Sequence, residues 1–102
     1  MAKPFIDLVG ASGAVYRFRN AAQGQIPATG GAFVYVEESA EGALQVLSFG
    51  RARALNRALA SLTMPRSGGL YLRLNVTAAL QDLEYADLAA VMPPETPLYE
   101  VE

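Results

Sequence analysis

Glu84 is the residue whose type and position point most directly to chemistry. Residues 76–91 have the apolar spacing of a helix, which turns about 100° per residue. The predicted core face holds Val76, Leu80, Leu83, Leu88 and Val91 together with Glu84 and Asp87, and the outer face holds Gln81, Asp82 and Tyr85. A carboxylate on a core face is costly unless it has a partner, a metal ion or a proton. We therefore expect Glu84 to be partly buried and to bind an arginine, a tyrosine hydroxyl or a metal.

The composition limits what Glu84 could do. The chain has no cysteine and no histidine. This excludes a disulfide-linked partner, a thiolate nucleophile, a Ser-His-Asp triad and most transition-metal sites. A metal at Glu84 would be a hard ion such as Mg²⁺ or Mn²⁺, which prefers oxygen ligands. If Glu84 is instead part of a structural ion pair, no cofactor is required.

Charge is distributed unevenly along the chain. The net charge of −2 argues against a dedicated nucleic-acid binder. Residues 51–73 nevertheless carry only basic charges, and residues 82–102 carry only acidic ones. Two interpretations stay open: the arginines bind phosphates, or they form ordinary solvated faces that pair with the acids. The candidates for phosphate binding are Arg51, Arg53, Arg57 and Arg73.

The hydrophobic pattern predicts one α+β domain over residues 1–102. Residues 10–13 (GASG) precede a strand pattern, which favours a hairpin turn over a dinucleotide site. We expect a small, mostly antiparallel sheet flanked by two helices and preceded by an N-terminal hairpin. With no signal-peptide or membrane-spanning pattern, the expected location is cytoplasmic, without a membrane partner. The predicted strands are 5–9, 15–19, 32–37, 43–49, 70–75 and 98–101, and the predicted helices are 51–62 and 76–91.

Residues 28–96 resemble the GIY-YIG nuclease superfamily. The resemblance rests on a strand containing Phe33-Val34-Tyr35, a partner strand ending at Gly50, an arginine-rich helix, and a helix that carries Glu84 ahead of Pro93-Pro94. In this superfamily two tyrosine motifs lie on adjacent strands, and an arginine and a glutamate follow on two helices. The glutamate holds one divalent metal, and the arginine stabilises charge on the attacked phosphate.

The resemblance implies a degraded active site. Tyr35 fits the tyrosine of the first motif, although Phe33 stands where glycine is usual. Gly50 fits the glycine of the second motif, but Ser48 occupies its tyrosine position. Ala58 occupies the position of the catalytic arginine, and Arg57 is one residue early, a rotation of about 100°. Glu84 fits the metal position, whereas the asparagine that commonly follows the proline is missing. Tyr35 also fits a second role, as a core residue whose hydroxyl lies at the edge.

Three hypotheses follow. The leading one is a non-catalytic GIY-YIG-like domain that binds a protein, or nucleic acid through the four candidate arginines. The second is a divalent-metal-dependent DNA endonuclease in which Glu84 binds the metal, Tyr35 orients or deprotonates water, and Arg57 replaces the missing arginine. The third is a small α+β interaction domain unrelated to nucleases, with Glu84 in an ion pair. Convergence of Tyr35, Arg57 and Glu84 on one cleft would favour the enzyme, and scattering would favour the third.

Overall fold

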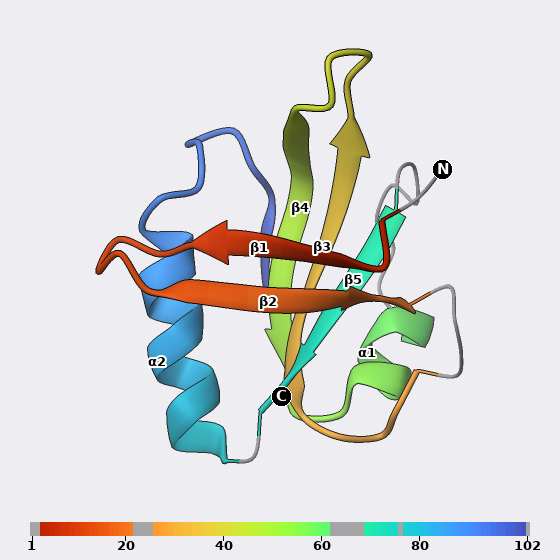
Figure 1. Cartoon of the computed structure of the whole chain (residues 1–102). Helices are drawn as coiled ribbons and strands as arrows, with labels where there is room; N and C mark the ends of the chain where they lie inside the picture. The colour runs from red at the N-terminus through yellow and green to blue at the C-terminus, as the bar shows by residue number, and fades with distance from the viewer. Residues whose placement is uncertain (1–2, 22–25, 62–68, 76, 102) are drawn as a thin grey trace.

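The computed structural model describes residues 3–21, 26–61, 69–75 and 77–101. Within these residues, six strands form one curled mixed sheet with two helices against it (Figure 1). The strand order is β1-β2-β5-β3-β4-β6, and only the β4–β6 pair is parallel. The elements are β1 (Phe5–Val9), β2 (Val15–Asn20), β3 (Gly31–Glu38), β4 (Leu44–Ala52), α1 (Leu55–Ser61), β5 (Gly69–Leu74), α2 (Ala78–Ala89) and β6 (Leu98–Val101).

The strand pairing predicted from the sequence is confirmed for the centre of the sheet. β3 pairs antiparallel with β4 on one side and with β5 on the other. The short last strand is also present, as β6 beside β4. β1 and β2 pair antiparallel, and β2 in turn pairs with β5 through Arg19 opposite Leu72. The first two strands therefore belong to the same sheet as the rest.

The turn between β1 and β2 explains the glycine-rich segment at residues 10–13. Gly13 has φ of 88°, a left-handed conformation that favours glycine. Its amide donates to the carbonyl of Gly10 at 3.0 Å, and a strand follows. This local geometry is that of a tight turn between two strands.

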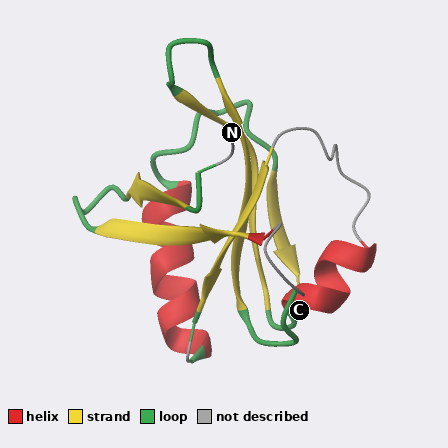
Figure 2. Cartoon of the chain, turned by 45° about the vertical axis from the view of Figure 1, so that its right-hand side comes forward, coloured by secondary structure: helices red, strands yellow, loops and turns green. Residues whose placement is uncertain are grey.

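The sheet has a buried cluster on each face, because successive side chains of a strand alternate between faces. On one face, Val34 and Phe49 pack with Ile6, Phe18 and residues of α2. On the other face, Phe33 and Tyr35 pack with buried residues of α1. The curl brings β1 and β2 over the first face, so α2 and this strand pair share one core (Figures 1 and 2).

The prediction that Gly50 ends a strand and that a helix begins at Arg51 is wrong. β4 continues through Gly50 and Arg51 to Ala52, and α1 begins at Leu55. Gly50 is needed inside the strand because a Cβ there would lie 2.4 Å from Cζ of Phe33. The β6 strand also pairs with this part of β4 and so extends the sheet. Arg51 therefore lies on a strand, and Arg53 precedes the helix. The predicted end of this helix, residue 62, lies outside the described residues.

The predicted orientation of α2 is also wrong. Its buried residues are Gln81, Tyr85 and Leu88, of which only Leu88 was placed on the core face. Leu80, Leu83 and Val91 are exposed, Leu83 by 68%. Two contacts account for the rotation: the Tyr85 ring stacks on Phe49 with centroids 5.2 Å apart, and Gln81 Nε2 donates to the Ala52 carbonyl at 2.7 Å.

The ends of α2 differ slightly from the predicted bounds of 76 and 91. Thr77 is the N-cap, and its hydroxyl accepts from the Leu80 amide at 3.1 Å. Val76 lies outside the described residues. Across the part of the chain that is described, no helix has the length and apolar character needed to cross a membrane.

Candidate functional site

Glu84 is held by an arginine from the neighbouring strand. Arg73 Nε donates to Glu84 Oε1 at 2.7 Å, and Arg73 Nη2 donates to Oε2 at 3.2 Å. Asn75 Nδ2 also donates to Oε1, at 2.8 Å. The Glu84 side chain is only 14% exposed. The expectation of a partly buried carboxylate with an arginine partner is therefore confirmed. Glu84 nevertheless lies on the side of α2 that holds Gln81 and Tyr85, and the leucines expected beside it are exposed.

The electrostatics of this pair favour the charged forms. Burial raises the pKa of Glu84, but the hydrogen bonds from Arg73 and Asn75 and the arginine charge lower it more, so the pKa lies below its usual value. The hydrogen bond to Glu84 raises the pKa of Arg73. Both carboxylate oxygens thus already have cationic or amide donors. Among the described residues, no group of three or more carboxylates is placed to hold a metal ion. A metal role for Glu84 stays a prediction.

Tyr35, Arg57 and Glu84 do not come together. Tyr35 is buried in the cluster that packs against α1. Glu84 lies on α2, whose core residues pack against the opposite face of the sheet. Arg57 lies on the exposed side of α1. The sheet therefore separates the tyrosine that the resemblance makes catalytic from the glutamate that it makes a metal ligand.

Three of the four candidate phosphate-binding arginines have acidic partners within the chain. Arg51 pairs with Asp82 at 2.7 Å and Glu100 at 2.8 Å, and its guanidinium lies over the Tyr85 ring. Arg53 pairs with Asp82 at 3.1 Å and also donates to the Gln81 amide oxygen. Arg73 pairs with Glu84, as described above. Three acids of the segment 82–102 thus pair with three arginines of the segment 51–73.

A second carboxylate of α2 fastens the turn between β1 and β2. Asp87 Oδ2 accepts from the hydroxyls of Ser12 at 2.6 Å and Tyr16 at 2.7 Å, and Oδ1 accepts from the Ser12 amide at 2.8 Å. The hydrogen bonds from Ser12 and then Tyr16 lower the pKa of Asp87. Arg73 also lies over the Tyr16 ring, at 5.3 Å. The polar side chains around α2 therefore form a structural network that joins the helix to β2, β5 and the turn. Sequence spacing did not indicate the Ser12–Asp87 contact because 75 residues separate the two.

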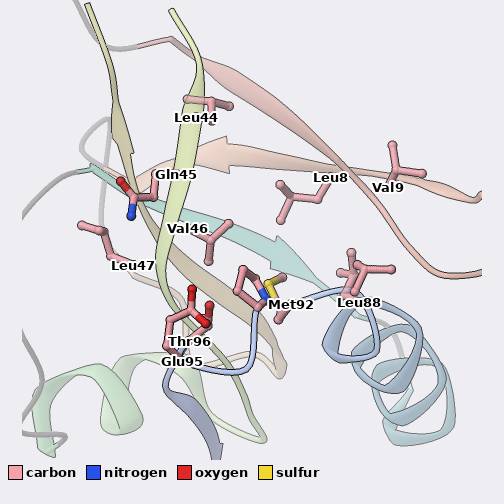
Figure 3. A pocket seen from close by; sticks show the side chains of 12 residues that line it. Leu8, Val9, Leu44, Gln45, Val46, Leu47, Leu88, Met92, Glu95 and Thr96 are labelled. Carbon is pink, nitrogen blue, oxygen red and sulfur yellow. The ribbon is translucent and has the colours of Figure 1, made fainter.

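A groove lined mainly by apolar side chains lies at the C-terminal end of α2 (Figure 3). It has a volume of about 520 Å³ and lies between β1, the first half of β4 and the segment after α2. Leu8, Leu88 and Met92 contribute apolar side chains to it, and the exposed Glu95 and the buried Thr96 contribute polar ones. No lysine or arginine is among its lining residues in the described chain. No sequence pattern indicated a site here, because these residues are far apart in the chain and most of them are aliphatic.

Comparison of the chain with protein-family models, with curated proteins and with solved structures found no match. The resemblance to the GIY-YIG superfamily therefore stays a prediction.

Proposed function

We propose that this chain is a non-catalytic protein-binding domain whose binding site is the apolar groove between β1, β4 and the end of α2. The observation that carries the proposal is the groove itself, a space of about 520 Å³ lined mainly by apolar side chains. Open apolar surface of this kind is typical of sites that bind apolar ligands or partner chains.

Two observations support binding without catalysis. Tyr35 and Glu84 lie on opposite faces of the sheet, so they cannot act on one scissile bond. Glu84 is held by Arg73 and Asn75 on both carboxylate oxygens. For the fold alone, the pairing of β3 with β4 supports a proposed GIY-YIG likeness, because it puts Tyr35 and Gly50 on adjacent strands.

A protein partner is favoured over nucleic acid by the state of the arginines. Arg51, Arg53 and Arg73 would each have to leave an acidic partner before contacting a phosphate. Nucleic-acid affinity depends on the number of phosphates that free basic groups neutralise. In contrast, no lysine or arginine is among the described residues that line the groove. Binding there therefore does not require an arginine to leave a carboxylate.

The proposal is tested by selecting short random peptides displayed on phage against the immobilised protein. The selected peptides should bind Leu83→Asp as well as wild type and bind Val91→Asp about tenfold more weakly, since an unpaired carboxylate against an apolar ligand costs about 1–2 kcal/mol. Both changes add the same charge at an exposed apolar position near the same helix, and only Val91 lines the groove.

Failure to select any peptide, or equal loss of binding in the two variants, would overturn the proposal. A parallel titration with labelled duplex DNA at low salt distinguishes the alternative. Binding to duplex that weakens with salt and is lost in Arg57→Ala would identify a nucleic-acid module instead.

A further inference from the structure

Among the described residues, no strand lies on the outer side of the first half of β4. β6 pairs with β4 only from Phe49 to Ala52, and the Phe49 amide donates to the carbonyl of Pro97, just before β6. Residues 44–46 pair with β3 on the inner side, Leu47 is the extra residue where the register shifts before Ser48, and within the described chain no strand covers the outer side of this stretch. This stretch is therefore an open sheet edge inside an otherwise paired strand.

The register shows which main-chain groups this edge presents. The turn between β3 and β4 closes with the Ser39 amide donating to the Ala43 carbonyl. Hydrogen-bonded pairs alternate with non-bonded pairs in an antiparallel ladder. Gln45, opposite Glu37, therefore bonds inward to β3, while Leu44 and Val46 direct their N–H and C=O groups away from it.

The groove lies along this same edge. Leu44, Gln45, Val46 and Leu47 all line it, although Leu44 and Val46 pack on one face of the sheet and Leu47 packs on the other (Figure 3). Because side chains from both faces of β4 line the groove, the groove lies beside the edge of this strand and not over one face of it. It therefore offers main-chain donors and acceptors next to apolar side chains.

The charges around the edge restrict what can occupy it. Glu95 is the one charged residue among the described lining residues. Glu37 and Glu38 lie opposite Gln45 and Leu44 on β3 and are exposed. These carboxylates make the surroundings of the edge acidic, and a second copy would add further carboxylates to them. A basic partner segment would complement them.

We infer that the open edge of β4 receives an extended segment of a partner protein as an added strand, with alternate apolar side chains in the groove and a lysine or arginine near Glu95. This inference rests on the proposed function and specifies the partner of the same groove. Strand addition uses main-chain hydrogen bonds for affinity and pockets for alternate side chains for specificity. The open stretch accommodates about four residues, or roughly 13 Å of strand.

The test uses an acetylated and amidated peptide of sequence Lys-Val-Thr-Val-Thr-Val-Lys, with binding measured by calorimetry. Two further peptides carry N-methyl groups, one on the valines and one on the threonines. Only one alternate set of amides faces β4 in an added strand, so one methylated peptide should lose binding at least tenfold and the other should keep it. The sensitive set is the valines for antiparallel addition and the threonines for parallel addition. Replacement of both lysines by glutamate should also weaken binding.

Two matched variants of the protein test the same main-chain hydrogen bonds from the β4 side. Val46→Pro removes an outward amide while leaving the hydrogen bonds of Gln45 to β3, and proline is tolerated at edge positions of this kind. Val46→Ala removes a similar apolar area and keeps the amide. We expect Val46→Pro to weaken peptide binding about tenfold relative to Val46→Ala, with both variants giving folded spectra by circular dichroism.

Failure of strand addition is distinguishable from failure of the proposed function. If display-selected peptides bind in the groove, but the Lys-Val-Thr series does not bind or tolerates methylation of both sets, strand addition is wrong and the protein-binding proposal stands. If neither selected nor designed peptides bind, both proposals are wrong.

Discussion

The two ends of α2 meet the sheet in different ways. Toward its N-terminal end, Gln81 and Glu84 turn to the strands and are hydrogen-bonded, Gln81 to the Ala52 carbonyl and Glu84 to Arg73 and Asn75. At the C-terminal end, Leu88 and the following Met92 line a groove beside an unpaired stretch of β4. At the first end the polar side chains are hydrogen-bonded to the sheet, whereas the groove at the second end is lined mainly by apolar side chains beside a stretch of β4 that no described strand covers.

The two ends therefore differ in role: the contacts at the first end stabilise the fold, and the groove at the second end is the proposed binding site. The conspicuous residues, a partly buried carboxylate and three of the four candidate arginines, are in ion pairs at the first end. Groups that are already hydrogen-bonded must lose that partner before they bind another molecule. The open edge at the second end has no such cost. In this chain, the charged residues that suggest chemistry form structural contacts, and the proposed binding surface consists of aliphatic residues and backbone.

The largest expected effect concerns the rotation of α2. Leu88→Ala should lower the free energy of unfolding by about 2–5 kcal/mol, because Leu88 is fully buried. Leu83→Ala should change it by less than about 0.5 kcal/mol, because Leu83 is largely exposed. Urea unfolding of both variants measures the difference. An equal decrease in the free energy of unfolding for both variants would show that both leucines lie in the core, as the sequence pattern predicted.

The next effect is that of the Glu84 pair. Glu84→Gln should lower the free energy of unfolding by about 1–3 kcal/mol, since Arg73 would be left with an uncharged partner. Glu95→Gln, at the exposed rim of the groove, is the matched control and should have little effect. Melting with and without Mn²⁺ sharpens the contrast. A rise in melting temperature with Mn²⁺ in wild type alone, together with a more stable Glu84→Gln, would show a metal site instead.

A smaller effect distinguishes two arginines that were both candidates for phosphate binding. Arg51→Ala should cost about 1–2 kcal/mol, because Arg51 pairs with two carboxylates and lies over Tyr85. Arg57→Ala should cost less than about 0.5 kcal/mol, because its side chain is exposed on α1. Thermal unfolding of the two variants at low and high salt checks this. Equal effects in both variants would show that the Arg51 ion pairs contribute nothing measurable.

The smallest effect is a pH dependence. The folded pKa of Glu84 lies below its usual value of 4.5, so its contribution to stability is present above that value and is lost as pH falls through the folded pKa. The difference in unfolding free energy between wild type and Glu84→Gln should therefore stay constant from neutral pH to mild acid and shrink below about pH 4.5. A difference that grows as pH falls from neutral would mean instead that the folded pKa is raised.

Much of the sheet could be predicted because its signals are local. Alternation in residues 32–37 and 43–49 reports which side chains share a face, and β3 and β4 formed where this pattern indicated. The end of β4 could not be predicted, because Gly50 looks like a strand terminator until the Phe33 ring and β6 are beside it.

The site was predictable only in part. Burial of Glu84 and its arginine partner followed from the cost of an unpaired carboxylate, which holds wherever the residue is placed. The helical face itself was predicted wrongly because periodicity counts hydrophobic residues. It cannot show that Gln81 and Tyr85 find better contacts, with the Ala52 carbonyl and the Phe49 ring, than the exposed leucines would.

The sequence by itself determined the element types of most segments, the antiparallel centre of the sheet and the need of Glu84 for a partner, since each depends on neighbouring residues or on one group's solvation. Only the tertiary structure decided which arginine binds Glu84, on which face Tyr35 lies, and that residues 44–47 keep an open edge beside a groove. An open edge is the absence of a neighbouring strand in space, and no residue type encodes that absence.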